Sequence, residues 1–259
     1  MQRARGAARV EIGRRGLVDL AQSGCAKAML PRVHGPAPEV AFLNTAGGVT
    51  GGDRLAYVCN VRAGAHVVAS TQTAERAYRS AGGTGRIDVA LEVGAGARLE
   101  WLPQETILFE GSRTARVTEA ALGEGATLLM AEMVTLGRGA MGETLARAWL
   151  DDRRSVRRAG RLVHEEHLAL TPDALADPAA LAGARAFATL ASIGPGAEDA
   201  LPGLRAVLPP LAAASAWDGR LVARFLHADP APLRRALVRA IVALRGGPAP
   251  RVWQVEEAP

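Results

Sequence analysis

Lysine, aromatic residues and cysteine are all scarce in this chain of 259 residues. Lys27 is the one lysine among 31 basic residues, and aromatic side chains make up 4% of the sequence. A nucleic-acid surface uses aromatic side chains as stacking platforms beside its basic residues. The arginine bias, together with abundant alanine, indicates coding composition rather than a selected basic surface, so we expect no nucleic-acid partner. The net charge of +5 still favours an acidic protein partner.

Long apolar runs are absent as well. No stretch approaches the roughly 18 consecutive apolar residues that a membrane helix needs, so we expect no membrane partner. The arginine-rich start, MQRARGAARV, lacks the apolar run and the cleavage signature of a targeting signal. The two cysteines, Cys25 and Cys59, have neither the close spacing of a metal clip nor the number of a disulfide scaffold. These features predict a cytoplasmic protein.

Alternating apolar residues predict β-strands through the first half of the chain. In the stretch RIDVALEV, Ile87 and Val89 face one way while Asp88 and Glu92 face the other. Similar runs, separated by glycine-rich corners, are RLAYVCNV, AHVVAST, ARLEWL, TARVTEA and ATLLMAEMVTL. This pattern is typical of many short strands joined by turns.

A faint internal repeat accompanies these strands. A glycine-alanine pair follows one strand-like run and precedes the next at Gly64, Gly96 and Gly125. The spacing of about 30 residues lies in the range of stacked β units. Three weak copies predict stacked hairpins and not a full solenoid.

Two helices are predicted in the C-terminal half. The clearer one has Asp229 as its N-cap, Pro230 at its first position and Gly246 as its stop, with apolar residues at helical spacing between them. The other lies in GAEDALPGLRAVLPP and must end near Pro209. The stretches GRLVARFLH and PRVWQV are predicted to be strands.

The predicted fold class is therefore mainly β (α+β), with stacked β-strands or hairpins forming an elongated scaffold that carries two helices in its C-terminal half. We expect a single domain over 1–259, β-rich over 8–170 and mixed α+β over 171–255. Apolar residues near the late helix, including Leu226 and Leu233, either fill the core or form part of a partner surface, and the sequence does not separate the two.

A glycine cluster, FLNTAGGVTGGDRL, has the spacing of a phosphate-binding loop. Such a loop needs a lysine after its last glycine, whereas this chain has Asp53, whose carboxylate repels phosphate. We interpret the cluster as a tight structural turn in which a positive φ or a close backbone approach excludes side chains. Its structural glycines are Gly47, Gly48, Gly51 and Gly52.

A second glycine pattern suggests an alternative function. Gly137, Gly139 and Gly142 match a dinucleotide-binding motif, and Glu165 lies at about the distance of a ribose-binding acid. That motif requires a helix after the glycines, but ETLARAWLDDRRSVRR has a poor helical stripe. A dinucleotide-dependent enzyme is the alternative hypothesis, and a generic β-repeat protein-binding module is another.

The charged stretch 151–167 offers further candidates. His164 and His167 flank two glutamates in HEEH, a group able to bind a divalent metal, but their spacing is not that of a helical zinc site. We interpret it as a surface strand whose charged residues face water. The basic run from Arg153 to Arg161 is interpreted as a solvated hairpin. No nucleophile and base can be paired from spacing alone, so we predict that the chain is not an enzyme.

Three motifs occur together in one order: NTAGGVTGGDRL, LPQETILFEGSR and LGRGAMGE. In this order and at these separations they resemble the UreD family of urease accessory proteins, called UreH in some organisms. The similarity extends from ARVEIGRRG to RVWQV, which is nearly the whole chain. The three motifs together are far more specific than any single glycine pattern.

The resemblance implies a non-enzymatic scaffold, mostly β with two helices. Such a scaffold binds apo-urease together with UreF and the GTPase UreG, and it helps the urease active site to receive two nickel ions. It implies no tightly bound cofactor, only transient Ni²⁺.

Four acids within or near the family motifs are the candidate nickel-path residues. A conduit for a divalent cation should be acidic, with too few ligands at any point to trap the ion. The candidates are Asp53, Glu75, Glu105 and Glu143. An ordinary surface or turn carboxylate is the alternative role for each of them.

Overall fold

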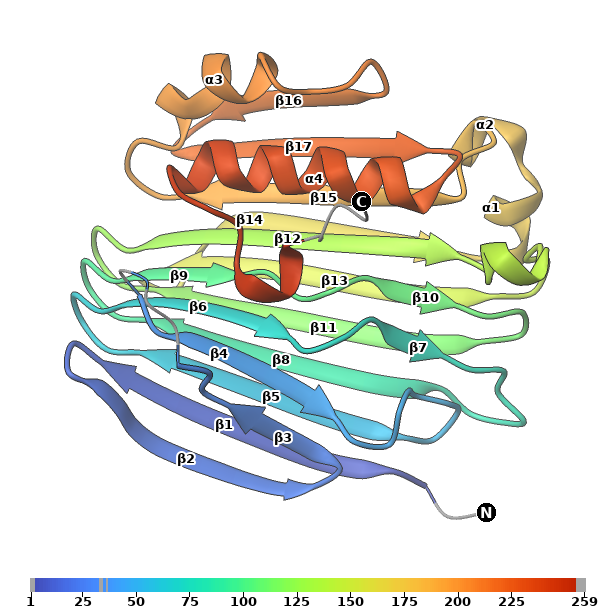
Figure 1. Ribbon diagram of the computed structural model, residues 1–259, viewed down its shortest axis with the longest axis horizontal. Helices are drawn as coiled ribbons and strands as arrows, with labels where there is room; N and C mark the ends of the chain where they lie inside the picture. Colours follow the sequence, from blue (N-terminus) through green and yellow to red (C-terminus); the bar gives the residue numbers. More distant parts are fainter. Residues whose placement is uncertain (1–2, 33–34, 36, 255–259) are drawn as a thin grey trace.

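Two packed layers of β-strands make up most of the molecule, as the computed structural model in Figure 1 shows. The structure describes residues 3–32, 35 and 37–254. The first sheet has seven strands in the order β14 (Arg161–Leu170), β13 (Trp149–Arg158), β11 (Arg113–Leu122), β8 (Gly85–Val93), β5 (Arg54–Val61), β1 (Arg5–Gly13) and β2 (Gly16–Gly24).

The second sheet has ten strands. Eight follow one another in the order β16 (Ala212–Trp217), β17 (Arg220–His227), β15 (Ala186–Ile193), β12 (Thr127–Leu136), β9 (Arg98–Trp101), β6 (His66–Thr71), β4 (Glu39–Asn44) and β3 (Ala26–Met29). The other two extend the sheet beside β12, where β10 (Thr106–Leu108) pairs with both β12 and β7 (Glu75–Ala77). The mainly β fold class is confirmed.

The internal repeat is a stack of parallel strands in both sheets. In the first sheet β5, β8 and β11 pair in parallel, and in the second sheet β6, β9 and β12 do the same. Each glycine-alanine corner carries the chain from one sheet to the other, with φ of 66° at Gly64, 61° at Gly96 and 63° at Gly125. Neighbouring corners are joined by backbone hydrogen bonds, including one of 2.9 Å from Gly64 to Ala95. The copies therefore stack as turns of a two-sheet coil and not as hairpins.

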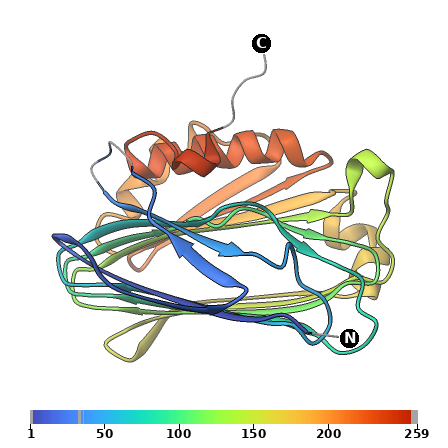
Figure 2. The same ribbon diagram turned by 60° about the horizontal axis from the view of Figure 1, so that its bottom comes forward.

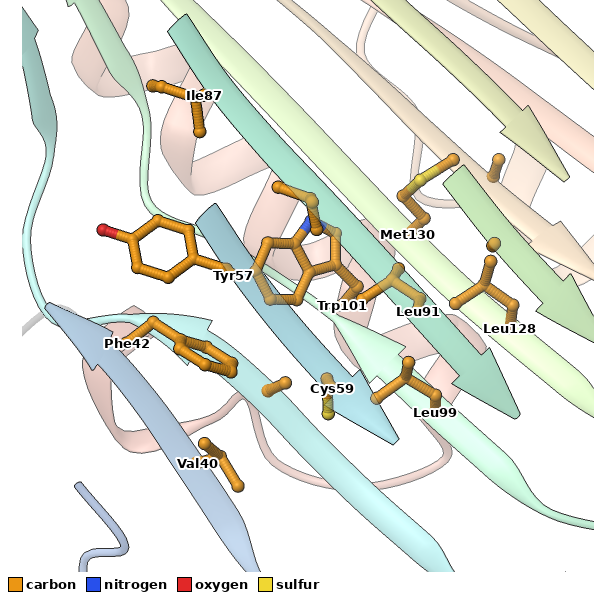
Figure 3. Close-up of a cluster of buried hydrophobic side chains, with 14 of the residues drawn as sticks. Val40, Phe42, Tyr57, Cys59, Ile87, Leu91, Leu99, Trp101, Leu128 and Met130 are labelled. Carbon is orange, nitrogen blue, oxygen red and sulfur yellow. The ribbon is translucent and has the colours of Figure 1, made fainter. Parts of the chain in front are cut away.

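The main core lies between the two sheets. Figure 3 shows side chains from both layers meeting there. Phe42 of β4 packs against Tyr57 of β5 and Trp101 of β9, with ring centroids 5.2 Å and 5.8 Å away. The alternation seen in RIDVALEV puts Ile87, Val89 and Leu91 into this core, as expected from its period.

A second core lies on the outer face of the second sheet. Figure 2 shows α4 (Pro230–Arg245) covering the face that points away from the first sheet. Asp229 caps α4 by accepting a hydrogen bond from the amide of Ala231, and Gly246 ends it in the left-handed conformation, as predicted. Leu233 is buried against the sheet, and Leu226 is half-buried against the main core. Both residues therefore serve packing.

The remaining helices are short. The second predicted helix is present as η2 (Glu198–Ala200) and α3 (Leu201–Arg205), and it ends earlier than expected. Two helices of the C-terminal half were not predicted, α1 (Pro172–Ala176) and α2 (Pro178–Leu181), and a 3₁₀ turn, η1 (Gly139–Met141), precedes β13. No helix within 3–32, 35 and 37–254 has the length and apolar character needed to cross a membrane.

The predicted strand PRVWQV is wrong. Residues 251–253 form the 3₁₀ turn η3 (Arg251–Trp253), and Val255 lies outside the described residues. Two prolines, Pro248 and Pro250, precede the turn and lack the amide protons that a strand ladder uses. Trp253 is fully buried, and its indole N–H donates to the carbonyl oxygen of Leu102 at 2.8 Å. The side chain of Trp253 therefore anchors this segment to the loop after β9.

Candidate functional site

The glycine cluster is a tight corner stabilised by its aspartate. Gly47, Gly48 and Gly52 have φ of 76°, 150° and 90°, and a Cβ on Gly48 would lie 2.3 Å from the ring of Tyr78. Asp53 is buried, and its two carboxylate oxygens accept hydrogen bonds from the amides of Ala4 and Thr50, both at 2.8 Å. The carboxylate thus fixes the corner to the start of β1.

Glu143 holds two other loops together. Its carboxylate accepts hydrogen bonds from the amides of Glu110 and Arg138, and it forms an ion pair of 2.9 Å with the Arg138 guanidinium. The hydrogen bond from the Arg138 side chain is the main cause that lowers the pKa of Glu143 to about 2. This acid therefore stays ionised and engaged at any physiological pH.

Glu105 belongs to a contact between the sheet and α4. Its carboxylate pairs with the guanidinium of Arg234 at 2.7 Å, and the same guanidinium contacts Gln104 and lies over the ring of Trp253. Arg234 thus ties the loop after β9 to the C-terminal turn. The ion pair with Arg234 gives Glu105 a structural role that needs no ligand.

Glu75 is the least committed of the four candidates. Its carboxylate accepts a hydrogen bond of 3.1 Å from the amide group of Asn44, and no ion pair holds it within the described residues. Burial raises the pKa of Glu75 to about 7, and the Asn44 hydrogen bond only partly opposes this. The backbone amide of Glu75 donates to the carbonyl oxygen of Glu105. Glu75 begins β7, and Glu105 directly precedes the paired strand β10, so the two residues are neighbours. Their side chains have different partners.

The four acids do not converge on one site. Asp53, Glu105 and Glu143 are each engaged by different backbone or arginine partners. Among residues 3–32, 35 and 37–254, no three histidine, cysteine or acidic side chains lie together in an arrangement able to hold a metal ion.

The raised pKa of Glu75 predicts a pH-dependent stability. Between its ordinary value of 4.5 and about 7, the folded chain holds a proton that the unfolded chain releases, so stability falls as the pH rises through this window. Over that pH range the free energy of unfolding should fall by about 1 to 3 kcal/mol in the wild type, and we expect Glu75→Gln to abolish this fall. Urea unfolding at several pH values measures it, with Glu119→Gln on the exposed face of β11 as the control. An unchanged slope in Glu75→Gln would contradict the prediction.

A buried ion cluster between the sheets was not expected from the sequence. Arg116 of β11 donates two hydrogen bonds to Asp152 of β13, at 3.1 Å and 2.7 Å, and pairs with Glu132 of β12 at 2.7 Å. It also donates to the hydroxyl of Thr106. Asp152 is fully buried, and Arg116 and Arg154 lower its pKa although burial opposes them. The cluster joins both sheets at mid-length.

The cluster continues toward solvent through Arg154. This guanidinium pairs with Asp152 at 3.4 Å and with Glu166 of β14 at 3.3 Å, and it contacts the hydroxyl of Thr189. Glu166 pairs in turn with the exposed Arg224 of β17 at 3.0 Å. A cavity of about 450 Å³ lies here between the sheets and is lined by Glu132, Asp152, Arg154, Glu166, Arg224 and apolar residues of β15 and α2.

The cavity is acidic in balance. Its lining includes four carboxylates, those of Glu132, Asp152, Glu165 and Glu166, against the guanidinium groups of Arg154 and Arg224. Arg116 pairs with Glu132 and Asp152 from outside the lining. Neither oxygen of Glu132 has a hydrogen bond of regular geometry within the described residues, and burial raises the pKa of this carboxyl. Glu132 is therefore the carboxyl of the cluster most ready to take a proton.

These findings correct the interpretation of the charged stretch 151–167. It does form a hairpin, but Asp152 and Arg154 lie on the inner face of β13 with Leu150, not in water. In HEEH, His164 is also buried, whereas His167 pairs with Asp151 at the surface. The signal was present in the sequence, because Asp152 and Arg154 fall on the same alternating face as core residues.

The dinucleotide hypothesis fails on geometry. Gly139 lies in the short turn η1, Gly142 ends that turn with φ of 64°, and the strand β13 follows where the motif requires a helix. Glu165 lies on β14, in a hairpin with β13. The strand, helix and strand that cradle a dinucleotide are thus not formed by this stretch.

Comparison with known proteins accounts for the three motifs. The family described as UreD urease accessory protein matches residues 3–254. The chain belongs to the UreD family. It is 54% identical to the urease accessory protein UreD of Dinoroseobacter shibae over 263 residues, covering 98% of this chain and 94% of that protein. For the UreD proteins of Cereibacter sphaeroides strain ATCC 17025 and Paracoccus denitrificans the identities are 56% and 51%, covering 98% of this chain and 96% and 94% of theirs.

The UreD motifs occupy one region of the fold. NTAGGVTGGDRL forms the corner between β4 and β5, LPQETILFEGSR surrounds β10, and LGRGAMGE forms the turn before β13. Tyr78, which lies between the first two motifs in the sequence, connects them: its hydroxyl donates to the carbonyl oxygen of Gly47, and its ring lies 5.0 Å from that of Phe109. The second and third motifs are joined by the hydrogen bond from the amide of Glu110 to the carboxylate of Glu143. The segments that identify a UreD chain are thus one interlocked group of loops.

Proposed function

We propose that this UreD-family chain is a cytoplasmic, non-enzymatic scaffold that binds apo-urease together with UreF and UreG and assists the insertion of nickel. The observation that carries the proposal is identity above 50% to three urease accessory proteins across 98% of the chain. Identity at this level over the full fold supports a shared role and a shared surface.

The architecture supports a scaffold in physical terms. The buried ion cluster and the main core hold the two sheets together, and α4 with Trp253 covers the second sheet. Rigid elements lose little conformational entropy on association, which favours affinity. The two cysteines, Cys25 and Cys59, are free, which agrees with a reducing compartment.

Formation of the complex tests this function directly. We expect the purified chain, UreF, UreG and apo-urease to elute together in size-exclusion chromatography, and the urease to elute without UreF and UreG when the chain is left out. A generic β-repeat binding module with no role in urease assembly would leave the elution of the other three proteins unchanged. That result would contradict the proposal.

We further propose a nickel path in which the ion is cargo. Asp53, Glu105 and Glu143 remain candidates, but a cation would have to displace backbone amides or arginines from each of them. Glu75 has the weakest competing contacts, and the acidic balance of the cavity around Glu132 and Glu166 suits a passing cation. Few ligands at each point allow the ion to leave again.

Glu75→Gln tests the path as well as the pH dependence. The amide keeps the shape of the side chain and its contact with Asn44 but removes the negative charge. We expect less nickel per urease from cells that carry this variant, with complex formation intact, and normal loading with Glu119→Gln. Normal loading with Glu75→Gln would remove this residue from the path.

A further inference from the structure

Four loops form one end of the molecule, the right-hand end in Figure 1. They comprise residues 45–54, 72–84, 102–113 and 137–149, and we call their outer surface the loop face. The loops are fixed to one another: the amide of Val49 bonds to the carbonyl oxygen of Arg76, the amide of Tyr78 bonds back to Val49, and Gly137 bonds to Leu108. The loop face is therefore a formed surface and not a set of independent loops.

The acids of these loops point into the structure. None of the five has an exposed side chain, and each has a described partner: Asp53, Glu75, Glu105, Glu110 and Glu143. Glu110 is typical, because its carboxylate accepts hydrogen bonds from the amides of Ala146 and Arg147 and pairs with the Arg147 side chain. The negative charges of the loops are thus bound by partners within the fold.

The arginines of the same loops point outward. All six are exposed: Arg54, Arg76, Arg79, Arg113, Arg138 and Arg147. Two of them, Arg138 and Arg147, pair with the inward acids. The other four, Arg54, Arg76, Arg79 and Arg113, form no ion pair within the described residues. Exposed acids lie outside the loop face: Asp88 of β8 and Asp151 of β13 are each paired with a neighbouring arginine, and Asp173 and Asp177 belong to α1 and α2.

Large apolar side chains are exposed among these arginines. Met141 is 72% exposed, Trp149 42% and Tyr78 39%. The aromatic faces are already covered in part, because Arg113 lies over Trp149 at 5.1 Å and Arg138 lies over Phe109 at 4.6 Å. Covered rings are poor stacking platforms for bases, whereas Arg, Trp, Tyr and Met are the side chains enriched in protein interfaces.

We propose that the loop face docks the acidic surface of a protein partner. The inference rests on the proposed function. One partner of the urease assembly would carry an acidic patch, and Met141, Trp149 and Tyr78 would contact the centre of that patch. The exposed arginines steer that surface and orient it, and the apolar side chains are desolvated on contact. Because the loops are already fixed, little ordering entropy opposes the contact.

Charge reversal on the loop face tests the inference. The variant Arg76→Glu/Arg79→Glu/Arg113→Glu changes three arginines that have no ion pair among the described residues. The matched control, Arg14→Glu/Arg15→Glu/Arg161→Glu, makes the same charge change in the β1–β2 and β13–β14 turns at the opposite end. A third variant, Met141→Asp, changes one exposed side chain and keeps the test valid if the triple variant does not fold.

Binding is measured separately to apo-urease, UreF and UreG, with single-stranded DNA and phosphatidylserine vesicles as further probes. We expect one of the three proteins to bind the loop-face variant at least about tenfold more weakly than the wild type, with the wild-type affinity falling as salt rises and the control variant unaffected. The inference is overturned if each of the three proteins binds the wild type, the loop-face variant and Met141→Asp with the same affinity. Loss of only DNA or vesicle binding also overturns it. If the wild type binds none of the three proteins, the proposed function itself fails.

Discussion

Asp152→Asn is expected to lower the free energy of unfolding by about 3 to 5 kcal/mol, the range for breaking a buried ion pair by removing one partner. The side chain of Asp152 is fully buried and pairs with both Arg116 and Arg154. An asparagine keeps the volume but leaves two buried guanidinium groups with less negative charge to balance them. Glu132 and Glu166 still contact these arginines, so the loss reflects the central acid and not the whole cluster.

The neighbouring Asp151 provides a matched control. It lies on the outer face of the same strand, where its side chain is 49% exposed and pairs with Arg153 and His167. Surface ion pairs contribute about 0 to 1 kcal/mol, so Asp151→Asn should leave the urea midpoint nearly unchanged. Equal midpoints for Asp152→Asn and Asp151→Asn would show that the buried cluster contributes little to stability.

The effect of Asp152 also has a pH signature. Its pKa is lowered in the folded chain, so its stabilisation is present at neutral pH and is lost as the pH falls through the acidic range. Glu75 has the opposite sign, because its raised pKa makes folding less favourable as the pH rises. In a plot of stability against pH, Asp152→Asn should therefore change the acidic end, and Glu75→Gln the range from pH 4.5 to about 7.

The strands and the long helix were predictable because local pattern decides them. Ile87, Val89 and Leu91 follow the period of a strand, and Asp229 with Gly246 brackets α4 by standard capping. The parallel coil was not predictable in the same way, because a glycine-alanine corner suits a hairpin and a sheet-to-sheet crossing alike. The segment of Trp253 was misassigned because long-range contacts, to Leu102 and Arg234, decide its conformation.

The site was less predictable than the fold. The family motifs gave the loops that gather at one end, but they did not distinguish an acid that caps a turn, such as Asp53, from one that is available, such as Glu75. The buried ion cluster depends on the pairing of β11 with β13 and on the packing of β12 of the other sheet against them, which no local pattern specifies. Its one sequence signal is a charged residue on the inner face of a strand, as at Arg116 and Asp152.

Omitting the chain is expected to have the largest effect of all. If it is the scaffold that joins urease to its nickel source, urease produced without it should lack most of its nickel and hydrolyse little urea. The cause is kinetic, because the active site then receives nickel only by unassisted encounter. A charge-reversed loop face should give an intermediate result, since it weakens one contact of the assembly and leaves the rest of the fold intact.

The most direct measurement is nickel per urease active site, by elemental analysis, on enzyme purified from cells that express the urease subunits, UreF and UreG with and without this chain. If the chain is the scaffold, we expect near-full occupancy with it and little without it, at equal amounts of urease protein. Equal occupancy and equal urea hydrolysis in both preparations would contradict it.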